Sequence, residues 1–162
     1  MSLEMKELLD TMPQIGSLDW IGVRPSREEP MDTLESVEIC LENGLVGDRF
    51  AGSAGAKRQV TLIQKEHIPV IQAILGCHEI KPETLRRNLL VSGINLQALK
   101  GKTFSIGNVV LLGTGNCPPC SKMEDSLGAG GYNAMRGHGG LTASVVTAGK
   151  ISVGDAVKLL TN

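Results

Sequence analysis

The 162-residue sequence predicts a mainly β fold, a sandwich or barrel that carries two or three short helices. Short apolar or alternating segments recur along the chain, separated by turns rich in glycine. Glycine numbers 20, where average usage near ~7% would give about 11. Aromatic residues are few, with one Trp, one Tyr and two Phe. A single domain over residues 1–162, with its core at about 20–160, is therefore expected.

Strand-like segments appear throughout the chain. Residues 103–106 and 109–113 read as a hairpin, because Gly107-Asn108 between them is typical of a tight turn. Gly154-Asp155 is expected to form another turn near the end of the chain. The remaining predicted strands are residues 19–24, 36–41, 59–64, 88–92, 143–147, 150–153 and 157–160.

Helical segments are fewer and shorter. Residues 66–75 carry apolar residues on one face, and Gly76 follows at the expected end. Pro69 fits only a first turn, which places the start of this helix near Glu66. Shorter helical segments are predicted at 4–9, 83–87 and 121–127, and no element is predicted at 25–33 or in the six-glycine stretch 128–140.

Charge and hydropathy exclude some classes of partner. The net charge is −1, whereas nucleic acids and anionic membrane surfaces attract proteins with a strong basic excess. No segment approaches the ~18 continuous apolar residues of a membrane helix. The first ten residues include several charged residues and lack the apolar stretch of a signal peptide. No signal peptide is therefore expected, and the sequence predicts a cytoplasmic location. In that compartment the four cysteines are more readily ligands, nucleophiles or buried hydrophobes than disulfides.

The Cys-Pro-Pro-Cys motif at 117–120 is the sharpest local feature. It follows a predicted strand and precedes a predicted helix, so Cys120 is expected at the helix amino terminus. Unpaired N–H groups and the helix dipole favour a thiolate there. Such a thiolate could act as a nucleophile, a sulfur acceptor or a ligand of a soft metal.

Other interpretations of these cysteines remain open. The motif could be half of a zinc site, completed by Cys77-His78 or by His138. It could be a redox dithiol, or both cysteines could be small buried hydrophobes. Cys40 lies on an alternating strand and is expected in the core.

Basic residues gather at junctions between predicted strands and loops. Paired arginines present planar forks suited to phosphate or other oxyanions, although an ordinary solvated surface is the alternative. The residues concerned are Arg49, Lys57, Arg58, Arg86 and Arg87, with Asn88 beside them.

The segment 136–140, Arg-Gly-His-Gly-Gly, could bring backbone close to an anion or could form a flexible lid. It matches neither the P-loop nor the dinucleotide-binding pattern. His138 within it is a candidate acid–base group.

Five segments in order resemble the MOSC domain family, named after the carboxy-terminal domain of molybdenum cofactor sulfurase. The resemblance covers about 20–160 and is to a stand-alone, bacterial-type member. A departure is Phe50, where many relatives carry histidine after Gly-Asp-Arg. The segments are Gly-Leu-Val-Gly-Asp-Arg at 44–49, Arg-Gln-Val at 58–60, Leu-Arg-Arg-Asn-Leu at 85–89, Cys120 with the residues after it, and Gly139-Gly140 with 149–155.

The resemblance implies a MOSC-type β-barrel in which Cys120 is the functional group, with Cys117 as an accessory. In relatives that reduce N-hydroxylated compounds, this cysteine binds the molybdenum of a pterin cofactor. In the sulfurase context the domain is thought to carry sulfur delivered by a separate pyridoxal-phosphate enzyme. The residues expected at the cofactor phosphate are Arg49, Arg58, Arg86 and Arg87, with Asn88.

The implied partners are therefore molybdopterin or a small-molecule substrate, and a cysteine desulfurase or redox partner. Whether the chain is itself an enzyme stays open. Two alternatives belong to other classes: a non-catalytic module that binds an anion or a partner, and a thiol-redox protein that uses both motif cysteines.

Overall fold

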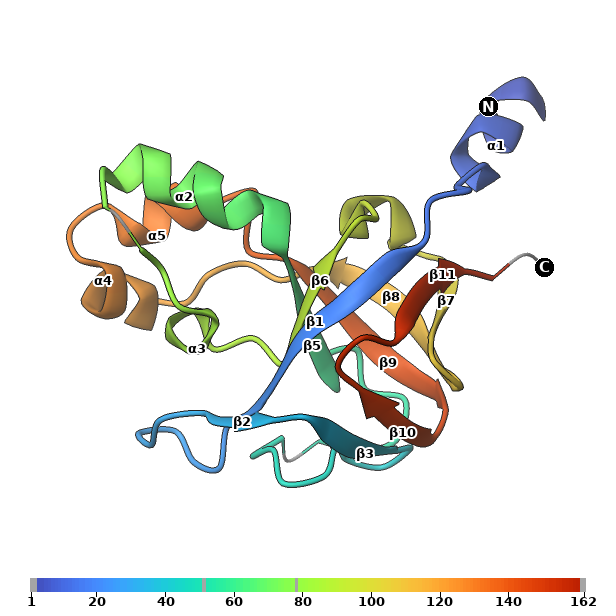
Figure 1. Ribbon diagram of the computed structural model, residues 1–162, viewed down its shortest axis with the longest axis horizontal. Helices are drawn as coiled ribbons and strands as arrows, with labels where there is room; N and C mark the ends of the chain where they lie inside the picture. The colour runs from blue at the N-terminus through green and yellow to red at the C-terminus, as the bar shows by residue number, and fades with distance from the viewer. Residues whose placement is uncertain (1–2, 51, 78, 161–162) are drawn as a thin grey trace.

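The chain forms a closed β-barrel with helices packed on one side (Figure 1). The computed structural model describes residues 3–50, 52–77 and 79–160. The barrel sheet runs β11-β7-β8-β9-β5-β6-β1, and β11 pairs again with β1, which closes it. The strands are β1 (Gly16–Val23), β2 (Asp32–Leu34), β3 (Ser36–Cys40), β4 (Gly44–Leu45), β5 (Val60–Gln64), β6 (Leu89–Ser92), β7 (Thr103–Ile106), β8 (Val109–Asn116), β9 (Leu141–Thr147), β10 (Gly149–Ser152) and β11 (Ala156–Leu159).

Two further strand groups extend the barrel. β2 pairs with the end of β1, and β10, β3 and β4 form a separate three-stranded sheet. Among the named strands of the described residues, β5 and β6 form the one parallel pair, so a crossover connection with a helix joins these two strands. The helices are α1 (Leu3–Asp10), α2 (Ile68–Leu75), α3 (Pro82–Leu85), α4 (Lys122–Leu127) and α5 (Gly131–Met135), with 3₁₀ turns η1 (Lys65–His67) and η2 (Leu96–Leu99).

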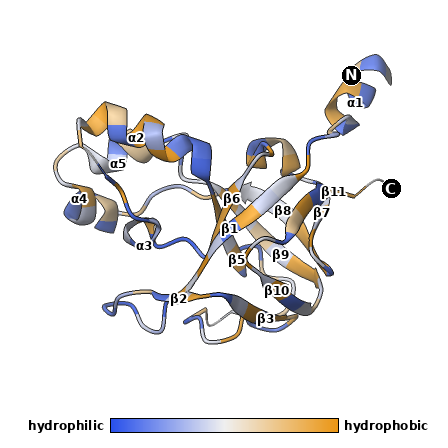
Figure 2. Cartoon of the chain, viewed as in Figure 1, coloured by the Kyte–Doolittle hydropathy of each residue, from blue (hydrophilic) through white to orange (hydrophobic). Residues whose placement is uncertain are grey.

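Apolar side chains form two clusters. The larger fills the barrel and includes Phe104, which is fully buried. The smaller lies between the outer face of β5 and β6 and the helices, and it includes Ile71 of α2 and Met135 of α5. All five residues of β5 are buried because this strand faces one cluster with each side. Figure 2 shows the hydrophobic residues along α2 and β9 that supply part of this packing.

The predicted mainly β barrel is confirmed, with differences in detail. β1 begins at Gly16, three residues before the predicted start, and β2 lies partly in the predicted loop. α2 carries its proline in the first turn and ends at Gly76, whose φ is 68°, as predicted. Five short α-helices form in the described residues, where the expected barrel carries two or three, and four of them match segments with predicted helical character. The unexpected one is α5, which exists because Ala134 and Met135 are buried under α2.

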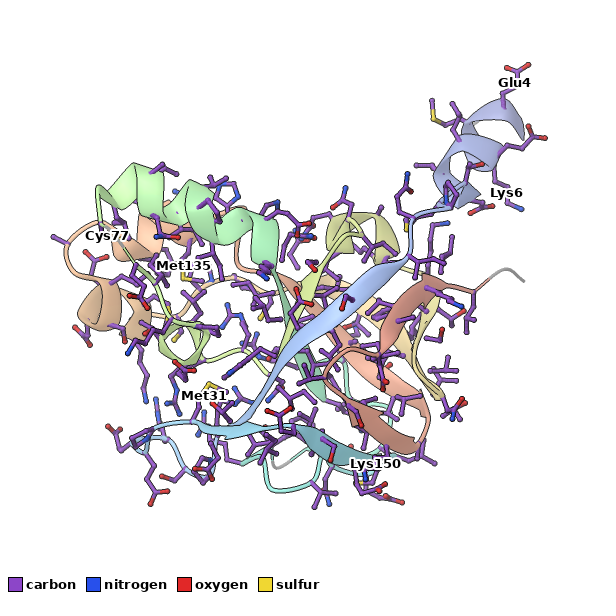
Figure 3. All side chains as sticks on the ribbon, in the orientation of Figure 1. Glu4, Lys6, Met31, Cys77, Met135 and Lys150 are labelled. Carbon is purple, nitrogen blue, oxygen red and sulfur yellow. The ribbon has the colours of Figure 1, made fainter. Side chains whose placement is uncertain are left out.

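Helix α1 stands apart from the barrel, and Figure 3 shows Glu4 and Lys6 on it, away from the rest of the chain. Asp10 at its end pairs with Lys102. Among the described helices, none has the length and apolar character needed to cross a membrane.

Candidate functional site

A cavity of about 200 Å³ lies beside the start of α4, and its wall is almost entirely cationic. Six arginines and one lysine line it together with one cysteine. Among the described residues no carboxylate lines the cavity, so it is suited to an anion. We call it the arginine pocket. Its residues are Arg24, Arg27, Arg49, Arg58, Arg86, Arg87, Cys120, Ser121, Lys122 and Met123.

Cys120 is the thiol of this pocket. It is a free, exposed cysteine, and its backbone oxygen accepts a hydrogen bond from Met123 N at 3.0 Å. Cys120 therefore opens the turn that leads into α4, close to the position expected from the sequence. Cys117 differs, because it is buried and lines a second cavity. The two cysteines of the motif thus line different cavities.

Arg87 is a buried scaffold residue, 4% exposed. Its guanidinium donates to Gly139 O at 2.8 Å, Cys117 O at 3.2 Å and Pro118 O at 3.0 Å. Burial lowers the pKa of Arg87, although an arginine stays protonated at physiological pH. Its main role is to fix the Cys-Pro-Pro-Cys segment against the loop before β9.

Arg86 holds the loop between β1 and β2. It is the one described non-glycine residue with a positive φ, 57°, at the end of α3. Its guanidinium donates to Glu29 O at 2.8 Å and Ser26 O at 3.1 Å. Burial lowers its pKa, the charges of Arg24 and Arg49 lower it further, and Asp48 and Cys120 oppose this lowering.

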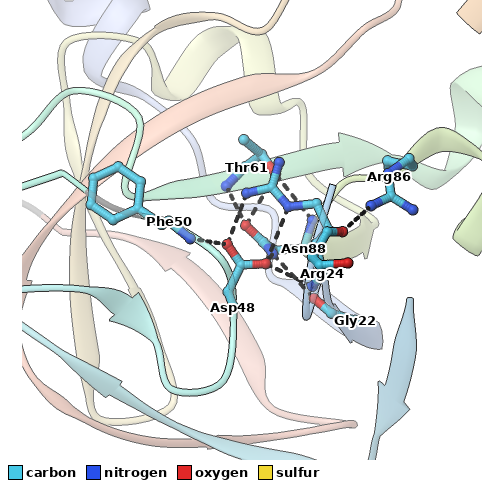
Figure 4. Close-up of polar contacts among 8 residues, drawn as sticks. Gly22, Arg24, Asp48, Phe50, Thr61, Arg86 and Asn88 are labelled. Carbon is cyan, nitrogen blue, oxygen red and sulfur yellow. Dashed lines mark hydrogen bonds and ion pairs between the residues drawn. The ribbon is translucent and has the colours of Figure 1, made fainter. Parts of the chain in front are cut away.

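A polar network around Asp48 holds Arg24, one of the pocket's lining residues (Figure 4). Arg24 forms two side-chain hydrogen bonds to the Asp48 carboxylate, at 3.1 and 2.8 Å. Asn88 donates to Asp48 Oδ1 and to Gly22 O, and its own oxygen accepts from Thr61. Burial alone would raise the pKa of Asp48, but the hydrogen bonds and charge of Arg24 hold it below its usual value.

This network changes the role expected of Asn88. It is fully buried, does not line the pocket, and donates to Gly22 O and Asp48, so it positions Asp48. Three arginines are different. Arg27, Arg49 and Arg58 are exposed, and no hydrogen bond or ion pair within the described residues engages their side chains. They are the cations most available to a ligand.

His138 lies outside the arginine pocket. Its ring packs edge-on against His67 of η1, with centroids 5.2 Å apart, and its buried Nδ1 has no hydrogen-bond partner among the described residues. Burial lowers the pKa of His67, and the charge of His138 lowers it further. The structure does not bring His138 together with Cys120.

The glycines beside His138 serve close packing. A Cβ at Gly139 would lie 2.1 Å from Cys117 O, and one at Gly140 would lie 1.9 Å from Leu62 O. The loop before β9 thus packs closely against the backbone at Cys117 and at Leu62.

The described residues contain no group of three or more histidine, cysteine or acidic side chains placed to hold a metal ion. His78, one of the residues considered for it, lies outside the described residues. Cys77 is exposed beyond α2, at the far end of the helical side (Figure 3). Cys40 is half-buried at the end of β3 rather than fully in the core.

Sequence reasoning missed three cations of the pocket, Arg24, Arg27 and Lys122. Arg24 ends the predicted strand 19–24, and Arg27 lies in segment 25–33, where no element is predicted. Only the fold brings this segment to the start of α4. There Lys122 donates to Arg27 O at 2.9 Å. The one available signal was Lys122 following Cys120 by two residues.

Fold and site together define a class: a closed β-barrel with an arginine-lined cavity and an exposed cysteine before a short helix. The family model described as MOSC domain matches residues 49–158, and the chain therefore belongs to the MOSC domain family. A comparison with curated protein sequences finds no match.

Solved structures share the fold. The YuaD protein from Bacillus subtilis is 21% identical, with a TM-score of 0.76 over 92% of this chain and 98% of that one. YiiM from Geobacillus stearothermophilus is 16% identical, with a TM-score of 0.70 over 90% of this chain and 75% of that one. YiiM from Escherichia coli is 18% identical, with a TM-score of 0.68 over 92% and 70%. At these identities the likeness establishes the fold.

Proposed function

We propose that the arginine pocket binds the phosphorylated end of a molybdenum cofactor and that Cys120 supplies the thiolate ligand to its metal. The observation that carries this proposal is the single cavity that unites seven cationic side chains with one exposed thiol. Membership of the MOSC domain family supports the choice of cofactor.

The side chains of the pocket suit both the metal and the phosphate of such a cofactor. A thiolate is a soft ligand suited to a metal such as molybdenum, and guanidinium forks suit a phosphate. The cavity of about 200 Å³ is smaller than the roughly 300–1,000 Å³ typical of small-molecule sites. It would therefore enclose a phosphate and the atoms next to it, with the rest of a pterin outside.

The chain's own residues divide the work of binding. Arg27, Arg49 and Arg58 would donate hydrogen bonds to the phosphate, because their side chains have no partner within the described chain. Arg87 would hold the Cys120 segment in place through its bonds to Cys117 and to the loop before β9. When bound, the cofactor would supply the two-electron chemistry by which relatives of the family reduce N-hydroxylated compounds.

The test is elemental analysis of protein from a host that makes the cofactor. We expect near-stoichiometric molybdenum in the natural sequence and in Cys40→Ala, which alters a cysteine outside the pocket. Cys120→Ala and the double variant Arg49→Gln/Arg58→Gln should each lose most of the metal. Equal molybdenum in Cys120→Ala and in the natural sequence would contradict the assignment of the ligand.

Exposure of Cys120 favours a second candidate, a sulfur carrier. A pyridoxal-phosphate desulfurase would present a persulfide on its own cysteine, and the Cys120 thiolate would attack the terminal sulfur. The S–S bond of the donor breaks, its thiolate leaves, and a persulfide forms on Cys120. Absence of molybdenum, together with a mass increase of one sulfur atom on Cys120 after incubation with a desulfurase and cysteine, would favour this candidate over the first.

A further inference from the structure

A second cavity lies against the same Cys-Pro-Pro-Cys segment. Its volume is about 220 Å³, and it shares no lining residue with the arginine pocket. The motif contributes Cys117 to this cavity and Cys120 to the other. We call it the proline pocket. Its residues are Gln97, Asn116, Cys117, Pro118, Pro119, Tyr132, Arg136, Gly137, Gly139 and Gly140.

The charge of the proline pocket differs from that of its neighbour. Arg136 is the one charged side chain among the described residues that line it. The guanidinium is exposed, and its one hydrogen bond within the described chain is to Asn133 Oδ1 at 3.3 Å. A guanidinium with most of its donors free binds a carboxylate through two parallel hydrogen bonds. One cation favours a monoanion, whereas seven favour a phosphate.

Part of the lining of the proline pocket is apolar. Pro118, Pro119 and Tyr132 supply this part, beside the polar side chains of Gln97 and Asn116. Tyr132 is 40% exposed, so part of its side chain is open to a ligand. A planar ligand body would cover part of this exposed ring and gain apolar burial. The volume corresponds to about seven water molecules at ~30 Å³ each, so the ligand must be small.

The cavity is held open by fixed contacts. Glu124 accepts the backbone N–H groups of Gly130 and Tyr132, each at 3.0 Å, and so anchors the first turn of α5. On the opposite wall, Arg87 ties Gly139 O to Cys117 O. Both walls are therefore fixed by buried or charge-assisted hydrogen bonds rather than by loose loops.

We propose that the proline pocket is a binding site for a small planar carboxylic acid, with its carboxylate on Arg136 and its apolar body against Tyr132 and the two prolines. The site stands on its own residues, so it holds whether or not the arginine pocket binds a cofactor. It would place an organic acid against the same segment that carries Cys120.

The probe for this site is benzoate, followed by amide chemical shifts in ¹H–¹⁵N spectra of the full chain. We expect saturable shifts centred on residues 132–140, and benzamide, which is neutral, should bind at least about tenfold more weakly. Arg136→Gln should weaken benzoate binding by about tenfold or more, and Tyr132→Ala should weaken it as well. Both side chains are exposed, so neither variant should unfold the chain.

The control is Arg58→Gln, which changes the arginine pocket and leaves the proline pocket intact. Arg58→Gln should keep the natural affinity for benzoate and reduce the affinity for inorganic phosphate. Arg136→Gln should reduce the affinity for benzoate and keep the affinity for phosphate. Benzoate shifts that do not saturate, that spread over the barrel, or that persist unchanged in Arg136→Gln would overturn the proposal. If the natural sequence bound benzoate but not phosphate, that result would count against the proposed function and not against this site.

Discussion

Arg87 shows how burial decides the role of a residue that the sequence assigns to a ligand. Its neighbour Arg86 is half-buried and holds a loop, while Arg58 is exposed and engages no partner within the described chain. The residue type alone does not distinguish these three arginines. Their hydrogen bonds do: Arg87 supports the fold, Arg86 holds a loop, and Arg58 is available to a ligand.

The variant Arg87→Met should destabilise the fold, because three buried or half-buried carbonyl groups would lose a charged donor. We expect the free energy of unfolding to fall by about 3 kcal/mol or more, measured by urea denaturation. Arg58→Met, at an exposed position, should change it by no more than about 0.5 kcal/mol. Equal effects of the two changes would show that Arg87 is not a scaffold residue.

Gly140 gives a second contrast at the scale of one residue. Its φ is 103° and an added Cβ would meet Leu62 O at 1.9 Å, so both strain and a backbone clash oppose Gly140→Ala. We expect a loss of about 3 kcal/mol or more in the free energy of unfolding. Gly137 also has a positive φ, 84°, but its Cβ would meet nothing within 4 Å. Gly137→Ala should therefore cost only about 1 kcal/mol, and a larger loss there than at Gly140 would refute the packing argument.

At the scale of elements, the Arg24–Asp48 pair ties the end of β1 to the loop after β4. The Asp48 side chain is 1% exposed, and Asn88 at the start of β6 joins the pair from a third segment. These three segments carry Arg24, Arg49 and Arg86, so the network sets the spacing of the pocket's cations.

Asp48→Asn should destabilise the chain in a pH-dependent way. The pKa of Asp48 is lowered in the folded state, so its stabilising effect is complete above the unfolded value of about 3.9 and is lost as the pH falls through the folded value. The variant should lose about 3 kcal/mol at pH 7, because it leaves Arg24, whose side chain is 14% exposed, without its counter-charge. The difference from the natural sequence should shrink below pH ~3.9. Denaturant unfolding across pH 3–7 measures it, and a constant difference would contradict this role.

At the scale of the whole molecule, alternation and glycine turns predict most of the barrel. Strands such as β3, β5, β7 and β11 lie within a residue or two of their expected bounds. Helix α5 escaped prediction because its stability comes from burial beneath α2, which a glycine-rich stretch does not reveal.

The sequence predicts which residue types gather at the candidate site, a cysteine and several arginines, but not what each side chain contacts. Cys120 and the arginines share a cavity as the resemblance suggested, but His138 does not join them. Cys117 and Cys120 are three residues apart and still line different cavities. Hydrogen bonds across the chain, such as Arg87 to Gly139, determine these outcomes, and no local pattern encodes them.

We propose that Cys120 and the arginines of the arginine pocket bind one anion together. The most direct test is the rate at which iodoacetamide alkylates Cys120, in a chain whose other exposed cysteine is removed by Cys77→Ser, as inorganic phosphate is added. We expect phosphate to slow the reaction saturably, chloride at equal ionic strength to have little effect, and Arg49→Gln/Arg58→Gln to abolish the protection. Alkylation that phosphate leaves unchanged would show that the thiol and the cations do not share a ligand.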